Sequence, residues 1–249
     1  MKTLPRSLPA LAIVFFLGAY TVQAHEIKLY FDQEGQVNEP VQIEFALGHF
    51  PDEFDHEHPF FQQVGASRLV VLDQDGAVIP LDYELQNDRY VAEFIPEQEG
   101  VYWVVSHASR GVVDRTDRTP AAGMQLRYYD AKAPLVVGGG EPPAAWPSFL
   151  HAEIQSTDRV PARVGESFTG QVSYKGEKLA EQAVLAISPT ERARELVTDE
   201  QGRVEMDFNE PGTWLIKTTV MDDDRSGAYG GEDYDRVRYN SSLYLEIRE

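Results

Sequence analysis

The histidines of this sequence are the residues whose spacing points most directly to chemistry. Four of the six lie between positions 25 and 58, namely His25, His49, His56 and His58. The last two lie in the acidic segment 51–58 (PDEFDHEH). Imidazole is a preferred protein ligand of zinc, copper and nickel, and carboxylates can complete such sites. This segment therefore predicts a binding site for a divalent transition metal.

The first 24 residues have the order of a secretion signal. Lys2 and Arg6 form a charged start, Leu11–Tyr20 is apolar, and the segment ends in the small residue Ala24. The apolar stretch is shorter than the roughly 20 residues that a helix needs to span a bilayer. We therefore expect cleavage after Ala24, export to the periplasm, and a mature chain that starts at His25 without membrane insertion.

Cleavage at that position would give His25 a free α-amino group beside its own imidazole. The amine and the ring Nδ1 can together chelate one metal ion, and one more histidine would complete a histidine brace, which is typical of copper. His49 follows Gly48 at the end of an alternating segment, and strand ends meet at the rim of a sandwich. On a strand, the two rings of the pair His56-Glu57-His58 would point to one face.

His107 ends another expected strand and could approach the same rim. His151 begins the second half of the chain, and we expect it to be structural. The predicted metal ligands are therefore His25, His49, His56, His58 and His107.

Composition excludes several other functions. The net charge is −19 at pH 7, whereas nucleic acid or an anionic membrane surface requires a basic face. The absence of cysteine excludes disulfides, thiolate metal sites and cysteine nucleophiles. The sequence contains no G-x-S-x-G, H-E-x-x-H, phosphate-binding loop or G-x-G-x-x-G motif. We therefore expect a binding protein rather than an enzyme, with no catalytic residues.

Short strands are the elements that must position the histidines. Several segments alternate between apolar and polar residues, turn signals separate them, and no amphipathic helix of ordinary length is present, which predicts an all-β sandwich fold. The expected strands are residues 26–31, 41–47, 69–72, 90–95, 101–105, 167–174, 183–188, 204–208, 214–220 and 242–247. We expect long polar loops at 111–123 and 222–238.

The segment 138–147 (GGGEPPAAWP) divides these strands into two groups. Its glycines and prolines cannot continue a strand or a helix, so it predicts a domain boundary. We expect two tandem Ig-like β-sandwich domains after the signal peptide, comprising residues 25–137 with the metal site and residues 148–249. Because the linker interrupts the strands, we expect no continuous sheet to join the two halves.

Several short motifs resemble those of one family. They are Ala24-His25, Gly48-His49, the YDAKA segment at 129–133, VGES at 164–167, LAEQAV at 179–184, TDEQG at 198–202 and PGTW at 211–214. They extend over essentially the whole mature chain, which resembles a bacterial periplasmic family of unknown function once described as the nickel-uptake (NikM-like) component of cobalt and nickel transport. The resemblance implies periplasmic handling of nickel or cobalt, with His25 and His49 as ligands. Since no membrane segment follows the signal, it favours soluble binding or delivery.

Three functions remain open from the sequence. The first is periplasmic binding of a divalent transition metal, nickel or cobalt and alternatively copper or zinc, for uptake, buffering or delivery to a membrane transporter. The second is a metal-free Ig-like module that recognises a protein or glycan through its loops. The third is a copper oxidase of the histidine-brace type. Affinity alone does not identify the metal, because copper binds most nitrogen sites more tightly than its neighbours do.

Overall fold

The computed structural model describes residues 25–51, 53–118, 120–139 and 148–249. The regular structure is 58% strand and 2% helix, which confirms the all-β sandwich prediction. The expected signal peptide at 1–24 and most of the expected linker, 140–147, lie outside the described residues. Within the described ranges, no helix has the length and apolar character needed to cross a bilayer.

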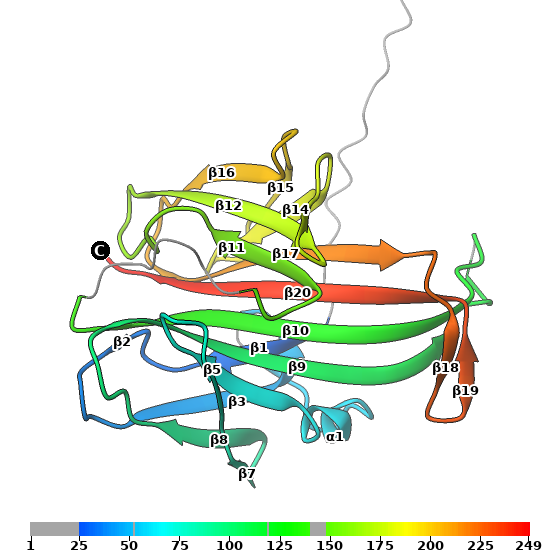
Figure 1. The fold of residues 1–249 in the computed structure, drawn as a ribbon, viewed down its shortest axis with the longest axis horizontal. Helices are drawn as coiled ribbons and strands as arrows, with labels where there is room; N and C mark the ends of the chain where they lie inside the picture. The colour runs from blue at the N-terminus through cyan, green and yellow to red at the C-terminus, as the bar shows by residue number, and fades with distance from the viewer. Residues whose placement is uncertain (1–24, 52, 119, 140–147) are drawn as a thin grey trace, which may run out of the picture.

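A nine-stranded central sheet contains strands from both halves of the chain (Figure 1). From edge to edge it consists of β15 (Ala193–Val197), β14 (Ala183–Ile187), β17 (Gly212–Asp222), β20 (Arg236–Ile247), β10 (Met124–Val137), β9 (Gly100–Asp114), β5 (Arg68–Leu72) and β6 (Val78–Pro80), and β2 (Glu34–Gly35) also pairs with β10. The halves meet where β10 and β20 run parallel, from Gln125 beside Arg236 to Lys132 beside Leu243. The expectation that no continuous sheet would join the two halves is therefore wrong.

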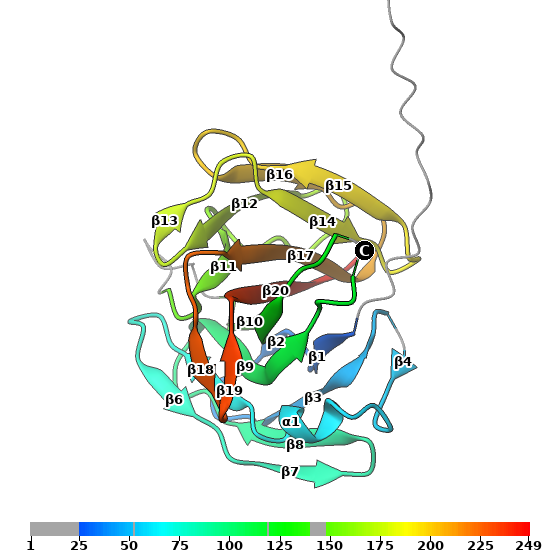
Figure 2. The same cartoon turned by 90° about the vertical axis from the view of Figure 1, so that its right-hand side faces the viewer.

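Two outer sheets cover opposite faces of the central sheet (Figure 2). The N-terminal outer sheet consists of β1 (Glu26–Tyr30), β3 (Val41–His49), β8 (Arg89–Phe94) and β7 (Tyr83–Gln86), with β4 (Glu53–Phe54) paired to β3. The C-terminal outer sheet consists of β11 (Ala152–Ser156), β12 (Ser167–Tyr174), β13 (Glu177–Lys178) and β16 (Arg203–Asp207). The remaining elements are the single-turn helix α1 (Phe61–Val64) and the hairpin of β18 (Gly227–Tyr229) and β19 (Glu232–Tyr234), which lies where a long loop was expected.

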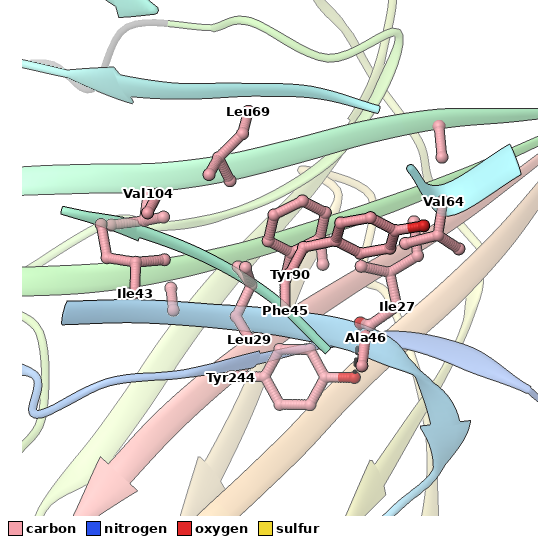
Figure 3. Packing of buried hydrophobic residues seen from close by; sticks show 14 of the residues in the cluster. Ile27, Leu29, Ile43, Phe45, Ala46, Val64, Leu69, Tyr90, Val104 and Tyr244 are labelled. Carbon is pink, nitrogen blue, oxygen red and sulfur yellow. Dashed lines mark hydrogen bonds between the residues drawn. The ribbon is translucent and has the colours of Figure 1, made fainter. Parts of the chain in front are cut away.

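Adjacent residues of the central strands point into two different cores. Val104 packs with Phe45 in the core beneath the N-terminal outer sheet (Figure 3). Trp103 packs with Phe168 in the core beneath the C-terminal outer sheet. Because side chains alternate along a strand, one strand contributes to both cores. A strand covered on both faces needs apolar residues at successive positions, and this explains the unbroken run at 101–105.

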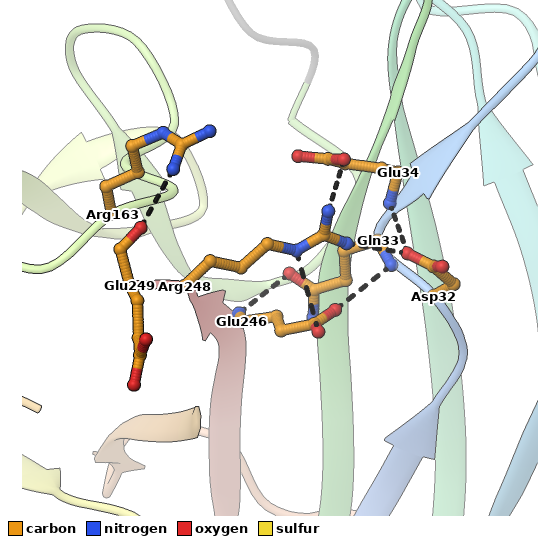
Figure 4. A network of polar contacts seen from close by, with 7 residues as sticks. All are labelled: Asp32, Gln33, Glu34, Arg163, Glu246, Arg248 and Glu249. Carbon is orange, nitrogen blue, oxygen red and sulfur yellow. Dashed lines mark hydrogen bonds and ion pairs between the residues drawn. The ribbon is translucent and has the colours of Figure 1, made fainter. Parts of the chain in front are cut away.

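A polar network joins the segment before β2 to the end of β20 (Figure 4). The guanidinium of Arg248 pairs with Asp32 at 2.8 Å and also with Glu34. The backbone N–H of Glu246 donates to Gln33 Oε1 at 3.0 Å. Exposed ion pairs of this kind contribute at most about 1 kcal/mol each. The network therefore sets the position of β2 against the central sheet more than it stabilises the fold.

Substituting Trp103 by alanine should destabilise both halves together. The side chain comes from the first half, is 0% exposed and packs among residues of the second half. Truncation should lower the free energy of unfolding by about 3–5 kcal/mol, because it leaves a cavity in a shared core. Guanidinium denaturation, followed by circular dichroism and fluorescence, should show one transition moved to lower denaturant.

Leu85→Ala is the matched control, since Leu85 is 54% exposed. It should change stability by less than about 0.5 kcal/mol. Two separate transitions in the Trp103→Ala protein, with only one displaced, would show that the halves unfold independently.

Candidate metal centre

The antiparallel pairing of β1 with β3 brings two predicted ligands together. Glu26 lies opposite Gly48, so continuing the register by one residue places His25 beside His49. The centroids of the two imidazole rings are 4.0 Å apart. The buried ammonium of Lys28 donates to the carbonyl oxygen of His49 at 3.3 Å, which helps to hold the end of β3 in place.

Asp55 brings a third histidine to the same place. Its Oδ1 accepts a hydrogen bond from the backbone N–H of His58 at 3.0 Å, and its Oδ2 lies 2.7 Å from Nε2 of His25. The ring centroid of His58 is consequently 4.2 Å from that of His25. We name His25, His49, His58 and Asp55 the histidine cluster.

Asp55 was visible in the sequence only as part of an acidic neighbourhood. An aspartate whose side chain accepts from a backbone N–H a few residues later is a common turn signal. The spacing of Asp55 and His58 fits that pattern and would have identified both residues as parts of one turn.

The protonation states of His58 and Asp55 suit metal binding. Burial lowers the pKa of His58, and the neighbouring His25 and Arg110 lower it further. The hydrogen bond with His25 is the main reason that the pKa of Asp55 is lowered. At neutral pH, His58 is therefore neutral and Asp55 is ionised, and these are the forms in which both side chains ligate metals.

Two ring nitrogens of the cluster are nevertheless engaged within the protein. The backbone N–H of Phe60 donates to Nδ1 of His58 at 3.0 Å, and Asp55 occupies Nε2 of His25. Across the described part of the chain, no three His, Cys, Asp or Glu side chains already surround one point as metal ligands do. The donor types nevertheless fit a transition metal.

His56 does not join the cluster, contrary to the expected joint ligation with His58. Residues 56–58 lie in a turn rather than on a strand, so the two rings do not share a face. His56 is exposed, and its charge contributes to lowering the pKa of Asp88, after the larger effect of Arg89.

His107 faces the opposite side of the central sheet, so it does not approach the other predicted ligands. Val105, two residues earlier on β9, belongs to the core beneath the C-terminal outer sheet. Nδ1 of His107 lies 2.6 Å from Oδ1 of the buried Asp130. Its ring begins a row of stacked rings formed by His107, Tyr128, Tyr239 and His151.

The His107–Asp130 pair should make stability depend on pH. Burial is the largest single influence on His107 and opposes its charged form, but the hydrogen bond to Asp130 and the negative charge of Asp130 together outweigh it and raise the pKa of His107. Burial raises the pKa of Asp130, and His107 partly opposes that shift. A histidine with a raised pKa stabilises the fold below about pH 6.5 and loses that contribution as pH rises through its folded-state pKa.

The free energy of unfolding lost on His107→Gln should therefore be larger at about pH 6 than at about pH 8.5. His151→Gln is the control, because burial lowers the pKa of His151 instead of raising it. The free energy of unfolding lost on this substitution should therefore be smaller at about pH 6 than at about pH 8.5. Denaturant titrations at both pH values test the pair. An equal loss on His107→Gln at both values would mean that the histidine is not charged in the fold.

The fold and the cluster together define a β-sandwich protein with a candidate metal centre beside the start of β1 and the end of β3. The family model described as "Domain of unknown function (DUF4198)" matches residues 22–222, and the chain belongs to this family. No curated protein matches the sequence.

Solved structures similar to this chain are Ig- or fibronectin-like at low identity. Salmonella alpha-2-macroglobulin reacted with methylamine is 13% identical, with 95% of this chain and 16% of that chain covered and a TM-score of 0.26. An ICAM-5 ectodomain fragment is 15% identical, with 90% and 47% covered and a TM-score of 0.24. The fibronectin(III)-like modules of Clostridium thermocellum CbhA are 11% identical, with 88% and 95% covered and a TM-score of 0.23. The chain thus spans under half of the first two, and likeness at this level carries no argument about function.

Proposed function

We propose that this protein binds a divalent transition metal ion through the histidine cluster. The observation that carries the proposal is the convergence of three imidazoles, from the residue before β1, the end of β3 and the turn after β4. The ring of His25 lies 4.0 Å from that of His49 and 4.2 Å from that of His58, centroid to centroid. The side chains of His25 and Asp55 are 25% and 27% exposed, so an ion in solution can reach them. Imidazole and carboxylate together form a donor set for nickel, cobalt, copper and zinc.

Asp55 has a positioning role in this proposal. Histidine ligands commonly donate their second ring N–H to a carboxylate, which fixes the orientation of the ring. With Nε2 of His25 held by Asp55 at 2.7 Å, Nδ1 is the nitrogen left for a metal ion. Nδ1 is also the nitrogen that forms a chelate with the α-amine of an N-terminal histidine.

We place this binding in the periplasm, after export and cleavage at Ala24. The proposed role of the site is metal uptake, buffering or delivery. Nickel or cobalt is the proposed cargo, because the sequence resembles the family once described as a nickel-uptake component. A membrane metal transporter is the proposed partner. Copper and zinc belong in the same tests, because they bind similar nitrogen donors.

Alanine substitution of His25, His49 or His58 should weaken metal binding at least tenfold. Loss of an outer-shell partner already costs about 10–100-fold, and loss of a direct ligand should cost no less. Calorimetric titration with nickel, cobalt, copper and zinc measures the effect on protein shown by circular dichroism to be folded.

His56→Ala and His151→Ala are the matched controls and should leave affinity unchanged, since neither ring lies in the cluster. If the three cluster substitutions affect no metal, the proposal fails, and recognition of a protein or glycan by a metal-free module takes its place.

The amine chelate has its own test in the first residue of the chain. Protein that starts at His25 should bind copper at least about tenfold more tightly than protein that retains Ala24, because one added residue turns the amine into an amide. This comparison changes no side chain of the cluster. Equal affinities would show that the imidazoles bind without the amine.

A further inference from the structure

A cavity of about 570 Å³ opens on the face of the central sheet that carries the N-terminal outer sheet. Its floor comes from β10, β20 and β17, its far wall from β14 and β15, and its near wall from His25 and Glu26 at the start of β1. Cavities of this volume are typical of small-molecule binding sites. The cavity is adjacent to the histidine cluster because His25 belongs to both.

The lining of the cavity is cationic although the chain is strongly acidic. It contains four arginines and Lys217 against two carboxylates, Glu26 and Glu195. Glu26 is already engaged, since it pairs with Lys217 and accepts a hydrogen bond from Ser242 at 3.2 Å. Glu195 is exposed on the outermost strand β15. The arginines of the cavity are Arg110, Arg115, Arg127 and Arg238.

Strand pairing places the arginines close together. Arg127 of β10 lies directly beside Arg238 of β20 in the parallel ladder, and like charges at such positions are destabilising. Arg110 is the extra residue of a β-bulge in β9, because Ser109 pairs with Tyr128 while Gly111 pairs with Arg127. Bulges often redirect one side chain next to a functional site.

The described residues supply no anion for these four guanidinium groups. None of the four takes part in an ion pair within the described ranges. Arg127 is only 5% exposed, and its Nε and Nη2 both donate to the neutral Gln125 Oε1, at 3.0 and 2.6 Å. Nε of Arg115 is buried without a hydrogen-bond partner. Burial, followed by the nearby Arg238, lowers the pKa of Arg127, so the folded protein disfavours this charge.

We propose that the cavity binds a small organic anion that carries two or more carboxylates. Planar guanidinium groups pair bidentately with carboxylates, and several of them together match a polycarboxylate. The side chains of Leu185 and Val197 alternate with those of the opposite core and lie on the cavity face, where they suit the carbon skeleton of such a molecule. A cationic cavity in an acidic protein also draws anions to this position. The inference does not rest on metal binding.

Citrate is the probe, used with the full mature chain freed of metal on a chelating resin. Calorimetry should show binding, and the neutral trimethyl ester of citrate should not bind. Inorganic phosphate should bind more weakly than citrate, because it presents no spaced carboxylates. No binding of citrate at millimolar concentration, or equal binding of the ester, would overturn the proposal, and tighter binding of phosphate would overturn the assignment to carboxylates.

Arg127→Gln and Arg238→Gln should each weaken citrate binding at least about tenfold, since each removes a charged donor. Arg203→Gln is the matched control, because Arg203 is exposed on β16 in the C-terminal outer sheet, and it should bind citrate as the wild type does. Citrate binding unchanged in both cavity variants would overturn the proposal.

The melting temperature distinguishes a binding role from a structural one. Without ligand, Arg127→Gln should melt no lower than the wild type, because the substitution removes a buried charge that has no anionic partner. A lower melting temperature combined with unchanged citrate affinity would assign the arginine to the fold instead. If Arg127→Gln does not fold, Arg238→Gln decides, since Arg238 is only partly buried.

Discussion

The parallel pairing of β10 with β20 is the interaction on which the architecture depends. It joins strands that are far apart in the sequence and makes one nine-stranded sheet from two sets of strands. Each face of that sheet is then covered by an outer sheet from one half of the chain. The two sandwiches therefore share their middle layer, and neither core consists only of residues from its own half.

The shared sheet also determines where chemistry can occur. The side chains at odd-numbered positions of β10 all lie on one face of the central sheet. Leu135, Ala133 and Ala131 belong to the apolar core, and Tyr129 and Arg127 line the cavity. The cavity lies where the N-terminal outer sheet ends, and the first residues of β1 form its near wall. This wall continues into the histidine cluster through His25, so the proposed anion site and the proposed metal site would be direct neighbours.

Buried charged residues explain why the sequence did not predict β10, the strand in the middle of the central sheet. Most expected strands are confirmed within a few residues, because apolar alternation or an apolar run identifies them. The sequence of β10 contains Arg127, Asp130 and Lys132, which suggests an exposed segment, yet all three are buried. Lys132 pairs with Glu153 of β11 at 2.6 Å, and Asp130 pairs with His107 of β9. Partners supplied by other strands make such burial possible, and a local pattern cannot show them.

The sequence by itself determined the all-β class and most strand positions, and it singled out His25 and His49 as candidate ligands, because each follows from local pattern or residue chemistry. Only the tertiary structure decided that His58 joins these two while His56 and His107 do not. A turn at residues 56–58, closed by the hydrogen bond from the His58 backbone to Asp55, separates the two members of the H-x-H pair. Strand alternation directs His107 to the other face of the central sheet. The arginine cavity likewise required the fold, because its members become neighbours only through long-range strand register and a bulge. Local patterns record which face of a strand is buried, whereas the partner on that face depends on pairing between distant segments.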